Sequence, residues 1–239
     1  MKFFLAPMQG LTGYTVRNAF HHHFDYIDKY YTPFIPAAKR MNAKIKRDID
    51  PVNNDGITLI PQAMSIVADE VIDLHSQLVP YGYDEINVNL GCPSGTVVSK
   101  KRGSGILAYP DMLDSFLDEL YTKADFPVSI KTRVGFNDDE LWTKLIEIYS
   151  KYPISELTVH PRVQKDFYKN TPRMDDFALA MQKINPDKTI LCYNGDITDT
   201  NSFNALTDRF PDIDEIMIGR GLFANPALIA ELKGISMDK

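Results

Sequence analysis

A cysteine at the end of an apolar segment is the residue of this chain best placed to do chemistry. A β-prone run over residues 85–90 is followed directly by Gly91-Cys92-Pro93. Glycine permits a tight turn and proline cannot continue a strand ladder, so we expect the Cys92 thiol on a loop at a strand end. A thiol there can serve as an acid or a nucleophile, whereas an isolated cysteine is more often a buried apolar residue. Two asparagines before it and a glycine-rich segment at 102–105 favour the chemical role.

Eight β-prone runs alternate with helix-like segments and together predict the fold. The runs cover residues 3–6, 29–34, 58–63, 85–90, 128–133, 156–160, 189–193 and 215–218, and the clearest helical segments cover 67–78, 112–120, 141–149, 176–184 and 202–210. Most runs are continuously apolar, which is typical of a parallel sheet buried on both faces. This alternation predicts an α/β fold, a (β/α)8 TIM barrel, as a single domain over residues 1–239. An open doubly wound sheet is the alternative, but residues 7–10 lack its glycine fingerprint.

Two local signals refine this prediction. Pro61 lies within the third run, and because proline is awkward in a central strand we expect a bulge or an early strand end there. Asn137 and Glu140 have the spacing of a capping box, which predicts a helix N-terminus just before residues 141–149.

Polar residues follow almost every predicted strand. The residues at these ends include Met8, Thr32, Gln62, Asn87, Asn89, Lys131, Arg133, His160, Arg162, Asn194, Gly219 and Arg220. Because barrels assemble their chemistry at the carboxyl ends of strands, we expect these side chains to surround one site. Strand ends that meet water are polar in any case, but that explanation accounts less well for a lysine and a histidine on adjacent strands.

The last two strand ends predict a phosphate site. Asn194-Gly195-Asp196 and Gly219-Arg220-Gly221 combine glycines, which expose backbone N–H groups, with a guanidinium that binds oxyanions. Barrels often bind phosphate between these two loops, although a pair of turn glycines is the plainer alternative. Lys131 and His160 would then form a cationic pair beside a phosphate-anchored cofactor, suited to the anion of a reduced flavin. A salt bridge on the barrel rim is the alternative for Lys131.

The other cysteine and the remaining histidines carry no metal signal. The consecutive histidines at 21–23 point apart on a helix, and no spacing resembles a zinc site, so we expect no metal. Cys192 lies inside the seventh predicted strand, where a core position is expected. Two cysteines provide no disulfide framework.

The composition bears on location and partners. No apolar run reaches the ~18 residues of a membrane span and the N-terminus lacks a signal-peptide core, so we expect a cytoplasmic protein with no membrane partner. The net charge of −6 opposes a generally basic nucleic-acid-binding surface. Basic residues nevertheless cluster after three strand ends, although any one cluster could be an ordinary solvated loop. The clusters are Lys39, Arg40, Lys44, Lys46 and Arg47; Lys100, Lys101 and Arg102; and Arg162, Lys165 and Lys169.

Taken in order along the chain, these motifs resemble the FMN-dependent tRNA-dihydrouridine synthases. The matching segments are Leu5-Ala6-Pro7-Met8, Thr32-Pro33-Phe34, Pro61-Gln62, Asn87-Val88-Asn89-Leu90-Gly91-Cys92-Pro93, Gly103-Ser104-Gly105, Lys131-Thr132-Arg133, Val159-His160-Pro161-Arg162, Asn194-Gly195-Asp196 and Gly219-Arg220-Gly221. Each segment is weak alone, but together they extend from the first predicted strand to the last.

The resemblance implies an FMN-binding catalytic barrel that reduces tRNA uridine to 5,6-dihydrouridine. NADPH would reduce FMN, flavin N5 would deliver a hydride to uracil C6, and Cys92 would protonate C5. The implied flavin-contacting positions are Pro7, Met8, Gln62, Lys131, His160, Asn194, Gly195, Asp196, Gly219 and Arg220. Asn89 and Arg162 fall on positions that handle the uridine, and the basic residues Lys100, Lys101 and Arg102 are expected to contact the RNA. The base must leave its stack to reach the flavin.

Two departures from the family pattern leave questions open. Tyr168-Lys169-Asn170-Thr171-Pro172 replaces a Tyr-x-Gly-x-Ala stretch, and the family's C-terminal helical tRNA-binding domain is expected to be absent or truncated. The alternatives are another FMN barrel acting on a free pyrimidine or enoyl substrate, and a catalytically weak flavin- or RNA-binding barrel. The sequence leaves open which tRNA uridine is modified, the oligomeric state and the choice between NADPH and NADH.

Overall fold

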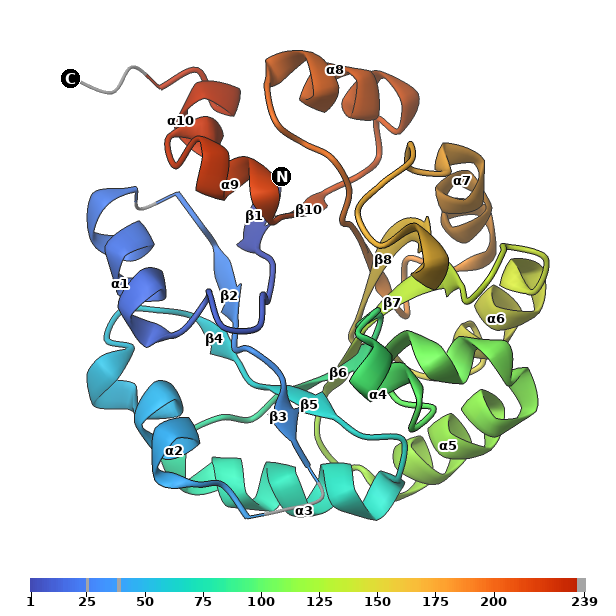
Figure 1. Ribbon diagram of the computed structural model, residues 1–239. Helices are drawn as coiled ribbons and strands as arrows, with labels where there is room; N and C mark the ends of the chain where they lie inside the picture. Colours follow the sequence, from blue (N-terminus) through green and yellow to red (C-terminus); the bar gives the residue numbers. More distant parts are fainter. Residues whose placement is uncertain (25, 38–39, 236–239) are drawn as a thin grey trace.

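Parallel strands lie side by side around a central axis, and helices cover the outside of the ring (Figure 1). The computed structural model describes residues 1–24, 26–37 and 40–235. Its strands are β1 (Lys2–Leu5), β2 (Lys29–Tyr31), β3 (Ile35–Pro36), β4 (Leu59–Ile60), β5 (Gln62–Met64), β6 (Ile86–Leu90), β7 (Val128–Gly135), β8 (Glu156–Val163), β9 (Ile190–Tyr193) and β10 (Glu215–Ile218). Its helices are α1 (Tyr14–His23), α2 (Ala43–Ile49), α3 (Ala68–Leu78), α4 (Gly95–Val98), α5 (Pro110–Lys123), α6 (Trp142–Tyr149), α7 (Met174–Lys183), α8 (Thr200–Arg209), α9 (Arg220–Ala224) and α10 (Leu228–Leu232), with short 3-10 turns between some of them.

The sheet order shows that the ring closes. The hydrogen-bonded order is β3-β5-β6-β7-β8-β9-β10-β1-β2-β4. β4 and β5 are one extended segment interrupted at Pro61, and β2 and β3 are another extended segment. Since β2 pairs with β4 and β3 pairs with β5, these two segments join the ends of the order. The predicted (β/α)8 barrel is therefore confirmed, and so is the early strand end predicted at Pro61.

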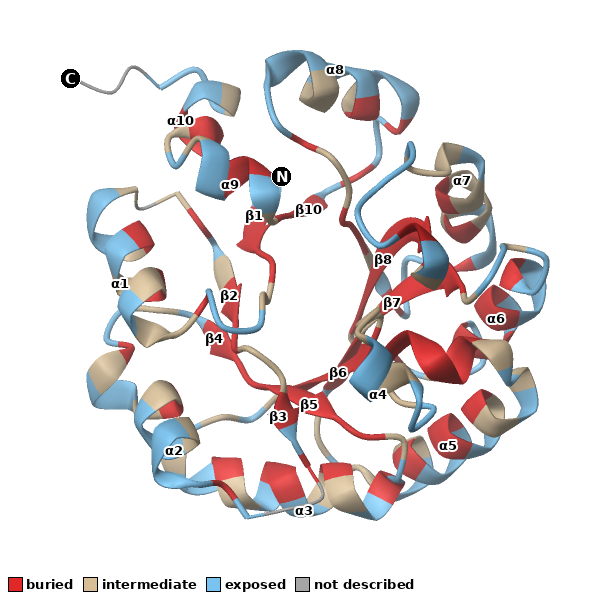
Figure 2. Ribbon diagram, in the orientation of Figure 1, coloured by how far each residue is buried: buried red, intermediate tan, exposed pale blue. Residues whose placement is uncertain are grey.

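The core lies between the strands and the inner faces of the helices (Figure 2). In α3, the spacing of Val67, Val71, Leu74 and Leu78 predicts one buried face; the last three are fully buried, whereas Val67 is the exposed N-cap, because the helix begins after it. Cys192 is also fully buried, which confirms its predicted core position. Among the described residues, no helix has the length and apolarity needed to cross a membrane.

The capping box predicted at Asn137 and Glu140 is wrong. The helix begins at Trp142, its N-cap is Leu141, and no side chain caps it. The backbone N–H of Glu140 instead donates to the Asp138 carboxylate in a local turn. The spacing matched the motif, but the helix starts too late for either side chain to reach its first N–H groups.

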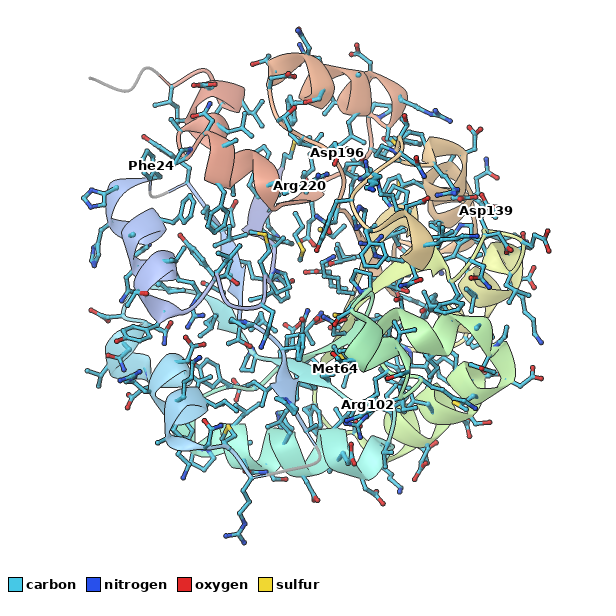
Figure 3. All side chains as sticks on the ribbon, viewed as in Figure 1. Phe24, Met64, Arg102, Asp139, Asp196 and Arg220 are labelled. Carbon is cyan, nitrogen blue, oxygen red and sulfur yellow. The ribbon has the colours of Figure 1, made fainter. Side chains whose placement is uncertain are left out.

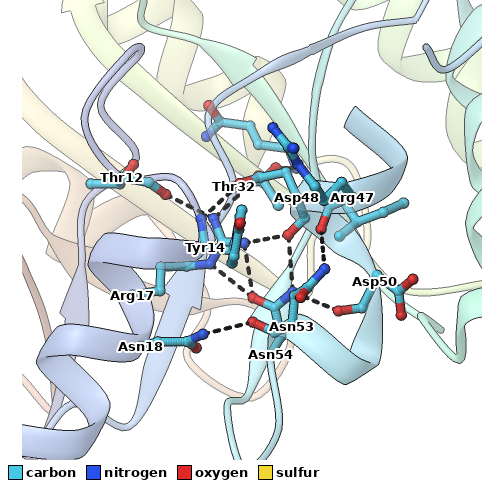
Figure 4. Close-up of polar contacts among 12 residues, drawn as sticks. Thr12, Tyr14, Arg17, Asn18, Thr32, Arg47, Asp48, Asp50, Asn53 and Asn54 are labelled. Carbon is cyan, nitrogen blue, oxygen red and sulfur yellow. Dashed lines mark hydrogen bonds and ion pairs between the residues drawn. The ribbon is translucent and has the colours of Figure 1, made fainter. Parts of the chain in front are cut away.

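A buried arginine fixes the loop between β1 and α1, which leads to the barrel mouth (Figure 4). Arg17, with no exposed surface, donates to the Thr12 carbonyl at 2.7 Å, to Asn54 and to both the carboxylate and the carbonyl of Asp48. The Thr12 hydroxyl in turn accepts the N–H of Met8 at 2.9 Å. This network ties Met8 to α1 and to the turn after α2, so the loop is rigid where it reaches the mouth.

Candidate active site

The predicted site residues gather around one opening at the carboxyl ends of the strands. A cavity of about 370 Å³ is lined by Pro7, Met8, Gln9, Leu11, Phe34, Gln62, Asn89, Gly91, Cys92, Pro93, Lys131, Tyr168 and Arg220. A smaller notch of about 70 Å³ adjoins it and is lined by Ala6, Pro7, Met8, Lys131, His160, Tyr168, Asn194, Gly195, Asp196, Gly219 and Arg220. The cavity and notch together are lined by Cys92, Asn89 and all ten residues predicted to contact a flavin. Arg162, Lys100, Lys101 and Arg102 do not line either space.

A relay of side-chain amides holds the loop that carries Cys92. The Asn89 oxygen accepts the backbone N–H of Gly91 at 3.1 Å and that of Cys92 at 2.9 Å. The Asn89 amide nitrogen donates to Gln62 at 2.7 Å, and Gln62 donates to Asn87 at 2.8 Å. Because these residues lie on β5 and β6, the position of the cysteine backbone is set by the sheet itself.

The other side of the cysteine is fixed by the glycine-rich segment. The Cys92 carbonyl accepts the N–H of Ser104 at 3.1 Å and its hydroxyl at 2.8 Å. Gly103 has a φ of +54°, and a Cβ there would lie 2.8 Å from the same carbonyl. This close approach explains why glycine stands at position 103.

The environment of Cys92 favours the neutral thiol. Burial raises its pKa, and a backbone hydrogen bond and the charges of Arg133 and Lys131 offset this only in part. A thiol that keeps its proton at neutral pH can donate that proton, whereas a nucleophilic cysteine needs a lowered pKa. The site is therefore suited to acid catalysis by Cys92.

Arg133 joins the cysteine loop to the loop after β8. Its guanidinium, almost completely buried, donates to the carbonyls of Gly91 at 3.0 Å, Val163 at 3.0 Å and Phe167 at 2.7 Å. Arg133 was expected at a strand end and belongs to a matching motif, but no role was predicted for it. Nothing in the local sequence indicates that the guanidinium of Arg133 donates hydrogen bonds to three backbone carbonyls.

Lys131 and His160 do not form the cationic pair that the sequence suggested. Burial, together with the charge of Arg133, lowers the pKa of Lys131 to about 7. Burial also lowers the pKa of His160 well below its ordinary value, and Arg133, Lys131, Arg162 and Arg220 all reinforce this shift. His160 is therefore neutral at physiological pH, and Lys131, which donates to Asn194 at 2.5 Å, is the titratable cation of the pair.

Asp196 joins Arg162 and Arg220, and Figure 3 shows Asp196 and Arg220 on the same side of the barrel mouth. Its carboxylate accepts from Arg220 at 2.5 Å and from both terminal nitrogens of Arg162. Burial opposes ionisation of this carboxyl, but the hydrogen bonds and charges of the two arginines outweigh it and lower the pKa of Asp196. Arg220 is half exposed and can exchange partners, whereas Arg162 is buried.

Tyr168 is a second residue of the site for which no role was predicted. It lines both spaces, and the guanidiniums of Arg220 and Arg133 lie 5.1 Å and 5.6 Å from its ring centroid. Asn170 stands where the family pattern has glycine and has a φ of +59°. Asparagine tolerates the left-handed region better than most residues, so the chain can adopt this conformation here without a glycine.

The basic residues near Cys92 have different surroundings. Arg102 pairs with Glu70 on α3 at 3.2 Å and lies away from the notch (Figure 3). The Lys101 ammonium lies 4.3 Å from the centroid of the Tyr109 ring, and Lys100 is exposed. Lys39 lies outside the described residues. No group of three or more His, Cys, Asp or Glu side chains in the described segments is arranged to hold a metal ion.

Solved structures with the same architecture define the class of this chain as a TIM barrel. Morphinone reductase aligns with a TM-score of 0.65 at 11% identity, covering 100% of this chain and 87% of the other. The old yellow enzyme from Trypanosoma cruzi aligns with a TM-score of 0.64 at 8% identity, covering 100% and 89%. At these identities the likeness establishes the fold alone.

The family follows from the sequence comparison. The family model described as Dihydrouridine synthase (Dus) matches residues 4–238, and the chain belongs to this family. A probable tRNA-dihydrouridine synthase of Staphylococcus aureus (strain Mu50) is 34% identical over 154 residues, which are 63% of this chain and 46% of that protein. The tRNA-dihydrouridine synthase B of Pasteurella multocida is 26% identical over 243 residues, covering 98% of this chain and 69% of that protein. The match to the staphylococcal relative thus spans about half of that protein's length.

The raised pKa of Cys92 predicts that its thiol is alkylated slowly at neutral pH. Alkylation of Cys92 by iodoacetamide, followed by peptide mass spectrometry across pH, should show a midpoint above that of the unfolded chain because burial raises the pKa. In Arg133→Gln the midpoint should rise further, since a nearby cation is lost. Arg209→Gln, which removes an exposed arginine paired with Asp175, is the matched control and should leave the midpoint unchanged. A wild-type midpoint at or below that of the unfolded chain would contradict this account.

Proposed function

We propose that this chain is the FMN-binding barrel of an enzyme that reduces uridine in tRNA to 5,6-dihydrouridine. The observation that carries the proposal is the shared cavity, in which the Cys92 thiol and the Lys131 ammonium line one space with Asn89 and Gln62. Membership of the dihydrouridine synthase family supports the same reaction. Bound FMN, reduced by NADPH, would supply the hydride for uracil C6.

The residues present fit FMN. The notch is small, and beside the Asp196 carboxylate it presents two cations, Arg220 and Lys131, that a phosphate could use. A Cβ at Gly219 would lie 3.3 Å from Ala6 and 3.7 Å from the Met8 sulfur, so any larger residue would narrow this space. The adjoining cavity extends from the notch past Lys131 to Cys92, which leaves room for a flat ring system.

The chain's own groups have separate tasks in this proposal. Lys131 stabilises negative charge on the flavin, and a neighbouring anion would favour its protonated form at neutral pH. Cys92 donates the proton to uracil C5, for which its protonated thiol is suited. The amide relay through Asn89 keeps the cysteine backbone fixed while the substrate enters. Phe34 and Leu11 line the cavity and help to exclude water.

Removing the acid should stop the reaction without removing the cofactor. In single turnover with excess enzyme and unmodified tRNA, Cys92→Ala should slow dihydrouridine formation by at least about 100-fold, the usual contribution of a positioned acid. Flavin content and NADPH oxidation should be nearly unchanged. Cys192→Ala, which alters a thiol buried in the core, is the control and should retain the parent rate. If Cys92→Ala reduces tRNA at the parent rate, Cys92 is structural.

Lys131→Met should make the flavin harder to reduce. A charge-assisted contact of about 1.5–3 kcal/mol to the reduced ring would be lost, which lowers the two-electron potential by roughly 30–60 mV. The potential would be measured by titration against a reference dye, with the exposed Lys144→Met as control. An unchanged or more positive potential would contradict the assigned role of Lys131.

We also propose that Lys100, Lys101 and Arg40 contact RNA phosphates, whereas Arg102 contributes less because it pairs with Glu70. The double variant Lys100→Gln/Lys101→Gln should weaken tRNA binding and reduce the salt slope of log K by about 2, as expected for two phosphate contacts. The matched control is Lys144→Gln/Lys151→Gln, on α6 and in the turn that follows it, where both lysines pair with aspartates. Equal salt slopes in the two double variants would argue against this surface.

A further inference from the structure

A continuous chain of polar contacts connects His160 to the notch through Arg162. The terminal nitrogen Nη1 of Arg162 lies 3.1 Å from Nε2 of His160 and 3.0 Å from Oδ1 of Asp196. Nη2 donates to the second oxygen of Asp196 and to the Asn170 carbonyl at 2.6 Å. Nε donates to the carbonyls of Lys169 at 2.9 Å and Asn170 at 3.1 Å.

These contacts occupy the whole guanidinium. An arginine has five N–H donors, and each of those of Arg162 is directed at a partner within the protein. The side chain is 1% exposed and does not line the cavity or the notch. Direct contact with a uridine, which the sequence resemblance implied for Arg162, would require breaking at least one of these bonds.

The contact with His160 fixes the position of a proton. Arginine can only donate, so Nε2 of His160 must accept through its lone pair. A neutral imidazole whose Nε2 accepts carries its hydrogen on Nδ1. A protonated imidazole would instead direct an N–H at the N–H of Arg162.

The charges around His160 also favour its neutral form. The charged side chains that influence His160 are the cations Lys131, Arg133, Arg162 and Arg220. The nearest carboxylate of the notch, Asp196, is engaged by Arg162 and Arg220. No partner for Nδ1 is found among the residues that the structure describes, and His160 lines the notch.

We propose that Arg162 is a positioning residue that holds His160 as the neutral Nδ1–H tautomer, so that His160 offers a hydrogen-bond donor, and no charge, to the ligand of this site. The proposal deepens the proposed function, since it assigns the ligand of His160 as an acceptor atom of the cofactor. Positive charge at the ring then comes from Lys131, and Arg162 acts through His160 rather than on the substrate.

The tautomer can be measured in the flavin-free protein by long-range 1H–15N correlation NMR. The chain has five histidines, and the spectrum of His160→Gln identifies the signals of His160. We expect the cross-peak pattern of an Nδ1–H imidazole that is still neutral at pH 6.5, where an ordinary histidine is half protonated. An Nε2–H pattern, or an imidazolium at that pH, would overturn the proposal without any variant.

Arg162→Met tests whether Arg162 is the cause. With the donor removed, His160 should show a mixture of both tautomers and should titrate at a higher pH than in the wild type. Asp196→Asn is the matched control, because it alters the same network but leaves the Arg162–His160 bond in place, and it should retain the Nδ1–H pattern. If folded Arg162→Met still shows only the Nδ1–H pattern, a group other than Arg162 sets the tautomer, and the proposal is wrong. These spectra need neither flavin nor tRNA, so their outcome is independent of whether the proposed function holds.

Discussion

Burying cations at the mouth of a closed barrel imposes the constraint on which the site depends. Lys131, Arg133 and Arg162 are all removed from most of the solvent, and each must recover in hydrogen bonds what it loses in hydration. They do so chiefly with backbone carbonyls and amide oxygens, and Arg162 also donates to the Asp196 carboxylate, which lines the notch. A buried guanidinium must donate hydrogen bonds to carbonyl oxygens, and these bonds hold the loops that carry the carbonyls in place. The loop at 163–170 and the loop at Cys92 are therefore held in place by Arg133 and Arg162, whereas Lys131 and Arg220 line the space that an anionic ligand would enter.

Opposite charges lie at the other end of the strands. Glu156 begins β8, is buried, and accepts from Lys29 at 2.7 Å and from Tyr31 at 2.7 Å. Burial, reinforced by the charge of Glu156, raises the pKa of Glu215, which begins β10. Had these carboxylates stood at the carboxyl ends, they would have neutralised Lys131 and Arg133. Their separation along the strands leaves the mouth cationic in a protein whose net charge is −6.

The sequence predicted the positions of the site residues better than their partners. The continuous apolar runs and the rule for barrel strand ends were enough to bring Cys92, Lys131 and Asn194 to one opening, because those signals are local. The partners of Arg102 and Arg162 depend on residues from other elements, such as Glu70 on α3, and no local pattern encodes them. The same limit explains the error at His160, since its charge is decided by burial and by four cations from three segments of the chain. The prediction of a capping box at Asn137 was wrong for the opposite reason. The local spacing matches the motif, but the helix begins one turn later than the motif requires.

A neutral His160 changes how the charge of the site is controlled. Lys131 is left as the group that titrates near neutrality, with a pKa lowered by burial to about 7. An anion arriving beside it favours the protonated form, and loss of the anion favours the neutral one. The lysine can therefore gain its charge together with the ligand that needs it, while the flanking arginines remain charged throughout. Because Cys92 is also sensitive to Lys131, the proton affinity of the thiol should follow the charge state of the lysine. The thiol of Cys92 and the ammonium of Lys131 are thus coupled through space across one cavity, and the amide relay through Asn89 keeps the position of Cys92 relative to β5 and β6 constant.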